Sequence, residues 1–154
     1  MPSNQYSTLI SEVEKDVVGS LTIPASQSAG QITYLQFAND PELPSVLDNY
    51  YQSPSTQKSV LFGIYVTSSL AVDGYLKFSV DDVETNITFG PLNPTNINIQ
   101  NPVMFDHAIV LLPNAKMKVK FVQATATTAS VSETVGLRFI VAPKGKNVIK
   151  LPKR

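Results

Sequence analysis

Few residues of this chain could do chemistry, and its single histidine is the first of them. His107 directly follows Asp106. Neighbouring residues of a strand point to opposite faces of a sheet, so these two do not form the Asp–His pair of a catalytic triad. One histidine excludes a multi-histidine metal centre. The absence of cysteine excludes thiolate metal sites, thiol nucleophiles and disulfides.

Four acids lie close together in the sequence: Asp73, Asp81, Asp82 and Glu84. Carboxylate oxygens suit calcium, but strand alternation spreads these side chains over both faces of a sheet, so we interpret them as solvated turn carboxylates. The chain also has no phosphate-binding glycine loop. We therefore expect no enzyme, no catalytic residue, no metal and no cofactor, with a hydrolase whose site is built from loops as an open alternative.

The basic residues offer an interaction surface instead. Three lysines alternate with apolar residues, which places their ammonium groups on one face of one strand, and Arg138 joins that face if the last two strands pair as a hairpin. The alternative is a charged outer face that only discourages aggregation. The three are Lys116, Lys118 and Lys120.

The C-terminal tail, residues 143–154, holds five cations and no acid: Lys144, Lys146, Lys150, Lys153 and Arg154. Such an arm can bind nucleic-acid phosphates or an acidic neighbour. Protein contact is favoured because Val148, Ile149 and Leu151 add apolar groups that contribute nothing to phosphate binding. The candidate acceptor on a neighbouring copy is acidic: Glu12, Glu14 and Asp16.

Charge is unevenly distributed along the 154 residues, although the formal net charge is zero. Residues 1–110 hold three lysines and eleven acids, a net charge of −8, and residues 111–154 hold nine cations and one acid, a net charge of +8. This split permits contact between the two halves of neighbouring copies. The longest apolar runs are far shorter than the roughly 20 residues of a membrane span, so no membrane partner is expected. No secretory leader is visible at the start.

Periodicity predicts mostly strands. A helix is expected over 5–18, where apolar residues recur at helical spacing: Tyr6, Leu9, Ile10, Val13 and Val17. The alternative is an arm that packs on a neighbour. A second short helix is expected within 40–51, where prolines precede an apolar helical face of Leu43, Val46, Leu47 and Tyr50. Eight strands are expected at 32–37, 60–67, 74–80, 83–89, 97–100, 107–112, 116–125 and 131–141. Asp81 and Asp82 form a tight hairpin turn between two of them.

Eight short strands with brief helices predict an all-β protein, an eight-stranded antiparallel jelly-roll sandwich or barrel with a short N-terminal helix or arm and one short inserted helix. A seven-stranded immunoglobulin-like sandwich is the alternative. The expected organisation is an N-terminal helix or arm at 1–20, a jelly-roll domain at 21–142 and the basic tail at 143–154. Five residues should fill the core between the sheets: Phe78, Phe89, Phe121, Leu137 and Phe139.

The order of segments over about 30–142 resembles the single jelly-roll coat proteins of small icosahedral viruses and phages. The resemblance lies in a strand, the proline-bearing segment 44–51, a long strand with a serine-rich exit at 60–69, the strand 74–82, and two closing strands after Leu112 and Pro113. Many such coats carry a basic N-terminal arm, whereas here the start is acidic and the C-terminus basic.

The resemblance implies a capsid, decoration or other virion protein that self-assembles as a homo-oligomer. Its expected partners are copies of itself or other virion proteins, with nucleic acid as a second partner through the tail, and its expected location is the virion. The alternative function is a carbohydrate- or ligand-binding β-sandwich module, which needs exposed aromatic residues in a groove. The candidates for that groove are Tyr50, Tyr51, Tyr65 and Tyr75.

Overall fold

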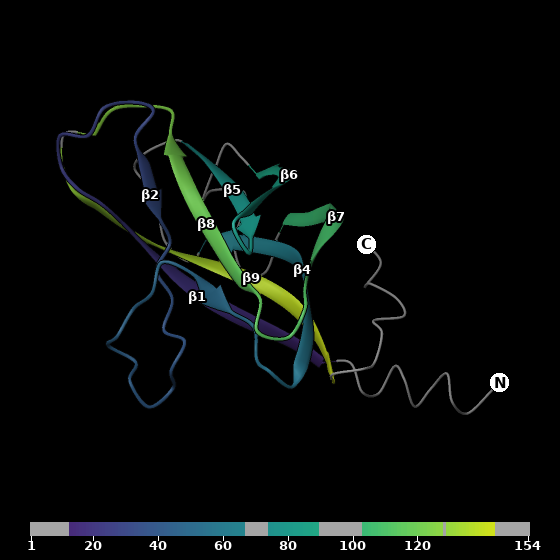
Figure 1. Cartoon of the computed structure of the whole chain (residues 1–154). Coiled ribbons are helices and arrows are strands. Elements are labelled where there is room, and N and C mark those ends of the chain that lie inside the picture. The colour runs from purple at the N-terminus through teal and green to yellow at the C-terminus, as the bar shows by residue number, and fades with distance from the viewer. Residues whose placement is uncertain (1–12, 67–73, 90–102, 128, 144–154) are drawn as a thin grey trace.

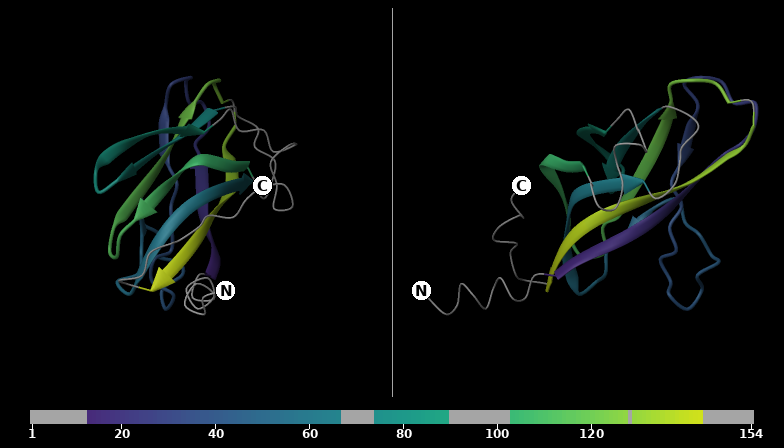
Figure 2. Two further views of the ribbon diagram at one scale, coloured as in Figure 1. Left: turned by 90° about the vertical axis from the view of Figure 1, so that its right-hand side faces the viewer. Right: turned by 180° about the vertical axis from the view of Figure 1, so that it is seen from behind.

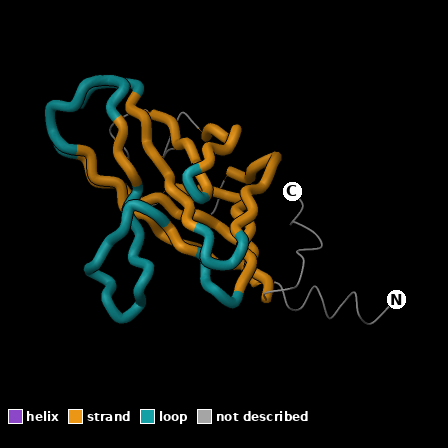
Figure 3. Tube along the Cα trace, viewed as in Figure 1, coloured by secondary structure: helices purple, strands orange, loops and turns teal. Residues whose placement is uncertain are grey.

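The computed structural model describes residues 13–66, 74–89, 103–127 and 129–143. These residues form antiparallel β-strands joined by loops, with no helix among them (Figure 3). The predicted all-β class is confirmed. Within these ranges no helix is long and apolar enough to cross a membrane.

Two sheets face each other as a β-sandwich (Figures 1 and 2). The first sheet runs in the order β1 (Val13–Ile23), β9 (Val131–Pro143), β4 (Gln57–Val66) and β7 (Val103–Leu111). The second runs in the order β2 (Ile32–Tyr34), β8 (Lys116–Gln123), β5 (Gly74–Val80) and β6 (Val83–Phe89). A short β3 (Tyr51–Gln52) also pairs with β8.

Apart from the two-residue β3, the strands pair in a nested order. β5 pairs with β6, β4 with β7, β2 with β8 and β1 with β9, all antiparallel. Each pair therefore encloses the chain of the pair before it. The innermost pair is a hairpin whose two-residue turn, Asp81 and Asp82, has positive φ angles of 49° and 65°. Two consecutive residues with positive φ form a hairpin turn whose twist matches the twist of the two strands that it joins. The predicted hairpin is therefore confirmed.

Alternate residues of both sheets fill the core. Phe78, Phe121, Leu137 and Phe139 are each at most 1% exposed. Phe89 was expected to join them, but it is only partly buried against the core cluster. Its strand β6 ends the second sheet, so less of its side chain is covered by neighbours. Each buried phenylalanine side chain contributes about 1.5–3 kcal/mol by leaving water.

Both predicted helices are wrong where the structure describes them. Residues 13–18 belong to the strand β1, and the rest of the expected helix lies outside the described residues. Val17 fits both a helical and an alternating pattern, and the pairing of all of β1 with β9 satisfies the backbone groups on one side of β1 in strand form.

The second expected helix is a loop (Figure 3). Leu43 and Val46 are 52% exposed, so the apolar face that suggested a helix has no surface to pack on. Asn39 holds the loop instead: its amide nitrogen donates to Asp48 Oδ2 (3.0 Å) and to the Tyr50 carbonyl (2.8 Å), and its oxygen accepts from the Gln52 N–H (2.9 Å).

Seven of the eight expected strands occur close to their predicted bounds, as β2 and β4 to β9. The expected strand 97–100 lies outside the described residues. β2 is shorter than expected because the chain leaves β8 after Leu35 and bonds to β1 instead, where the N–H groups of Ser20 and Gln36 each donate to the other residue's carbonyl at 2.9 Å. Gly19 beside this bridge leaves room for the ring of Phe37, whose Cε1 would lie 2.7 Å from an added Cβ.

Candidate interaction surfaces

The three lysines of β8 lie on the outer face of the second sheet. Met117, Val119 and Phe121 alternate with them and are fully buried. Lys116, Lys118 and Lys120 therefore share one face, as the alternation predicted.

Two lysines of this row are ion-paired with acids of the β5–β6 hairpin. Lys118 Nζ lies 3.1 Å from Asp82 Oδ1, and Lys120 Nζ lies 2.6 Å from Glu84 Oε1. Lys116 Nζ lies 4.8 Å from the centre of the Tyr50 ring, which is cation–π geometry. The row is thus an ion-paired surface of the monomer and not an uncompensated basic patch.

The acids interpreted from the sequence as turn carboxylates lie beside this lysine row. Asp81 Oδ1 accepts a hydrogen bond from the Lys116 backbone N–H at 3.0 Å, so each of the three described acids meets a β8 lysine residue. Asp73 lies outside the described residues. Among the described residues no group of three metal-ligating side chains occurs. The hydrogen bond and charge of Lys120 lower the pKa of Glu84, and Glu84 raises the pKa of Lys120.

A polar groove of about 340 Å³ lies over these pairs. It is lined by Tyr34, Lys77, Ser79, Asp82, Glu84, Lys118 and Lys120, together with Phe78. Tyr34 and Tyr75 are 39% and 40% exposed on this sheet. Tyr34 was not among the tyrosines named from the sequence. Of those that were, Tyr51 and Tyr65 are only 6% and 3% exposed, and the ring of Tyr50 lies under Lys116. The four tyrosines named from the sequence therefore do not form one groove.

Arg138 does not join the lysine row, because β8 and β9 belong to different sheets. Its Nε and Nη2 instead donate to the two carboxylate oxygens of Asp16 on β1, at 3.0 and 3.2 Å. The Tyr65 hydroxyl donates to Asp16 Oδ2 at 3.0 Å, and the guanidinium carbon lies 5.5 Å from the Tyr65 ring centre. The hydrogen bonds from Arg138 lower the pKa of Asp16. The pKa of Tyr65 is raised, chiefly by burial and also by its hydrogen bond to the Asp16 carboxylate.

Two sets of predicted site residues stay untested. Asp106 and His107 are consecutive residues of β7, but their side chains are outside the described part of the chain. The tail cations Lys144, Lys146, Lys150, Lys153 and Arg154 lie beyond the last described residue, Pro143.

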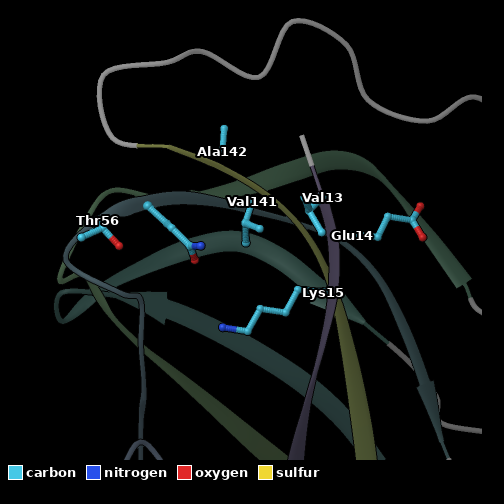
Figure 4. Close-up of a pocket in the computed structure, with 7 residues that line it drawn as sticks. Val13, Glu14, Lys15, Thr56, Val141 and Ala142 are labelled. Atoms are coloured by element: carbon cyan, nitrogen blue, oxygen red, sulfur yellow. The ribbon is translucent and has the colours of Figure 1, made fainter. Parts of the chain in front are cut away.

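The edge strand β1 carries Glu14 and Asp16, two of the three acids named above as the acceptor of a neighbour's tail, whereas Glu12 lies outside the described residues. β1 ends the first sheet, with β9 on one side only. A hollow of about 470 Å³ lies beside it, with Lys15, Asp16, Val17 and Val18 on one wall. A second hollow of about 610 Å³ surrounds the start of β1 and is lined by Val13, Glu14, Lys15, Thr56, Gln57, Val141 and Ala142 (Figure 4). A free strand edge was not predicted here, because residues 5–18 were expected to form a helix or an arm.

Comparison with known proteins adds little. No model of a known protein family matches the chain, and no curated protein matches it. Among solved structures, the mosquito-larvicidal Cry4Aa toxin of Bacillus thuringiensis is similar with a TM-score of 0.30 and 16% identity. The match covers 80% of this chain, which spans only 23% of the toxin chain. Similarity at that level carries no argument about fold or activity.

Proposed function

We propose that this chain is a non-enzymatic structural protein of a virion, which folds as an eight-stranded jelly roll and acts by assembling with copies of itself. The observation that carries the proposal is the nested pairing of its strands. A long antiparallel hairpin that folds over into two sheets produces a particular strand order in each sheet. Apart from the two-residue β3, this chain has those orders: β1-β9-β4-β7 and β2-β8-β5-β6. The double Greek-key jelly roll, which viral capsid domains use, is built from a hairpin folded over in this way, and this likeness supports the proposal.

The chemistry of the described surface supports a binding role over a catalytic one. Asp82, Glu84 and Asp16 are each ion-paired with a cation of another strand, so these charges hold strands of the sandwich together. The pKa shifts of Glu84 and Asp16 are downward, which keeps both carboxylates ionised. A general acid at neutral pH needs the opposite shift.

The test is the mass and shape of the particles that the purified protein forms. Light scattering and negative-stain electron microscopy over a range of protein and salt concentrations should show closed or regular assemblies. A monomeric mass at high protein concentration in low and high salt would refute the proposal.

The polar groove on the second sheet supports a second candidate, a carbohydrate-binding module. Carbohydrate sites combine an aromatic face with charged and hydroxyl groups, and Tyr34 stands beside Ser79 and the two ion pairs in this groove. Screening the protein on a glycan array tests it, with Tyr34→Ala as the variant that should lose binding. Absence of any glycan bound by the wild type would remove this candidate.

A further inference from the structure

The free edge of β1 carries a row of backbone groups that no described strand occupies. Ser20 directs both its N–H and its C=O away from β9, since both bond to Gln36. Backbone direction alternates along a strand, so Val18, Asp16 and Glu14 direct their N–H and C=O groups to that same side. For these three residues no backbone partner occurs among the described residues. An exposed edge of this kind is a template for one more strand.

A hollow lies beside this edge, where an added strand would run. The chain 32–37 approaches β1 at Ser20 and then turns away at Phe37 into the loop held by Asn39. The 470 Å³ hollow lies where it leaves, between β1 and a wall made of Phe37, Ala38, Asn39, Pro41, Tyr51, Gln52 and Pro54. The hollow at the start of β1 shares Lys15 with it, but it is lined also by residues of β9 and β4 and so crosses the end of the first sheet (Figure 4).

The two faces of this edge differ in chemistry. Glu14, Asp16 and Val18 lie on the outer face of the first sheet, because they oppose Ile140, Arg138 and Gly136. Val17 lies on the inner face opposite Leu137, toward the core. A strand added here therefore meets Val17 and Lys15 on its inner face, where apolar residues can pack on Val17. On its outer face a cation can lie beside Glu14, since Arg138 already pairs with Asp16.

Residues 146–151 of this chain have that pattern. Lys146, Val148 and Lys150 alternate with Asn147, Ile149 and Leu151. In an extended conformation Ile149 and Leu151 share one face and the two lysines share the other. The eleven residues after Pro143 can span about 36–40 Å when extended, which is enough to reach an adjacent molecule.

We propose that the open edge of β1 binds residues 146–151 of a second copy of this chain as an added strand. This inference rests on the self-assembly put forward above and specifies the contact that drives it. The donor and the acceptor are different surfaces of one molecule, so each copy gives a tail and receives one. Such a heterologous contact extends from copy to copy until it closes into a ring or shell.

Full-length variants test the contact from both sides. Val18→Pro removes an N–H directed at the incoming strand but none directed at β9, and an edge strand tolerates proline in that position. Its matched control is Val18→Thr, which keeps the N–H and the branched side chain. Ile149→Asp removes an apolar group of the donor, and Pro152→Asp adds the same charge outside the segment. Sedimentation velocity measures association, and circular dichroism checks that each variant is folded.

We expect Val18→Pro and Ile149→Asp each to weaken self-association by about tenfold or more, and the two controls to change it by less than about threefold. Mixing Val18→Pro with Ile149→Asp supplies an intact tail and an intact edge on different molecules, so one-to-one complexes should form. If circular dichroism shows that Val18→Pro has unfolded, Glu14→Pro blocks the same edge.

Three results separate the possible failures. A wild type that assembles while both variants assemble equally well overturns the inference and leaves the proposed function standing. Variants that lose association but do not complement each other overturn the second copy as the occupant, since the tail then binds its own chain. A wild type that never associates refutes both the inference and the proposed function.

Discussion

Gly136 is the position where a single methyl group should do most damage on the outer face of the first sheet. It lies on β9 opposite Tyr65 of β4. A Cβ at Gly136 would clash with the Cζ and both Cε atoms of the Tyr65 ring. Neither strand can move away, because β9 is paired on both sides by β1 and β4. Gly136→Ala must therefore displace the Tyr65 ring.

The expected cost follows from what that ring does. Tyr65 is 3% exposed, donates a hydrogen bond to Asp16 and lies under the Arg138 guanidinium. Overpacking costs about 1–3 kcal/mol and loss of a buried aromatic side chain about 3–5 kcal/mol. We expect Gly136→Ala to lower the free energy of unfolding by about 3 kcal/mol, which for a domain of this size lowers Tm by about 6–12 °C.

A double-mutant cycle with Tyr65→Ala isolates the clash. Without the ring, Gly136→Ala should be neutral or should stabilise by about 0.4–1 kcal/mol, because alanine restricts the unfolded chain. Urea unfolding followed by circular dichroism gives the four free energies. An equal cost of Gly136→Ala with and without the ring would show that the glycine is required for its backbone conformation, and would refute the argument from Tyr65.

Three further predictions follow from burial and charge. Phe121→Ala should cost about 3–5 kcal/mol in urea unfolding and Phe89→Ala less than half of that, since only Phe121 is fully buried; equal costs would contradict the strand faces. Because Arg138 lowers the pKa of Asp16, this pair should stabilise the fold above the ordinary value of 3.8 and lose that effect as the pH falls below it; Arg138→Gln should flatten this part of a stability–pH curve. Asp82→Gly should raise Tm slightly, because glycine adopts the φ of 65° freely and the exposed pair with Lys118 contributes under about 1 kcal/mol; a lower Tm would mean that the pair outweighs the strain.

The two strands predicted with the right bounds at both ends, β5 and β6, have strict alternation. β5 and β6 occur at the expected bounds because their apolar residues repeat every second position and Asp81 and Asp82 end both runs. This information is local. β1 was missed because Val13 and Val17 suit a helix as well as a strand, and only its partner β9, more than 100 residues away, decides between them.

The candidate surfaces divide in the same way. Alternation within β8 placed Lys116, Lys118 and Lys120 on one face. Their partners could not be predicted, since Asp82 and Lys118 are brought together only by the pairing of β5 with β8. Arg138 was assigned to the wrong sheet for that reason: consecutive strands such as β8 and β9 commonly form a hairpin, but nested pairing places them in opposite layers.

Nested pairing also changes the meaning of the charge split along the sequence. It brings the late strands back against the early ones, so Arg138 meets Asp16, Lys118 meets Asp82 and Lys120 meets Glu84. Three of the nine late cations are thus neutralised by early acids within one molecule. Five of the other six belong to the tail after Pro143. For the proposed self-assembly we therefore expect charge attraction between copies to come chiefly from the tail, because the described sandwich pairs three of the other four late cations with acids.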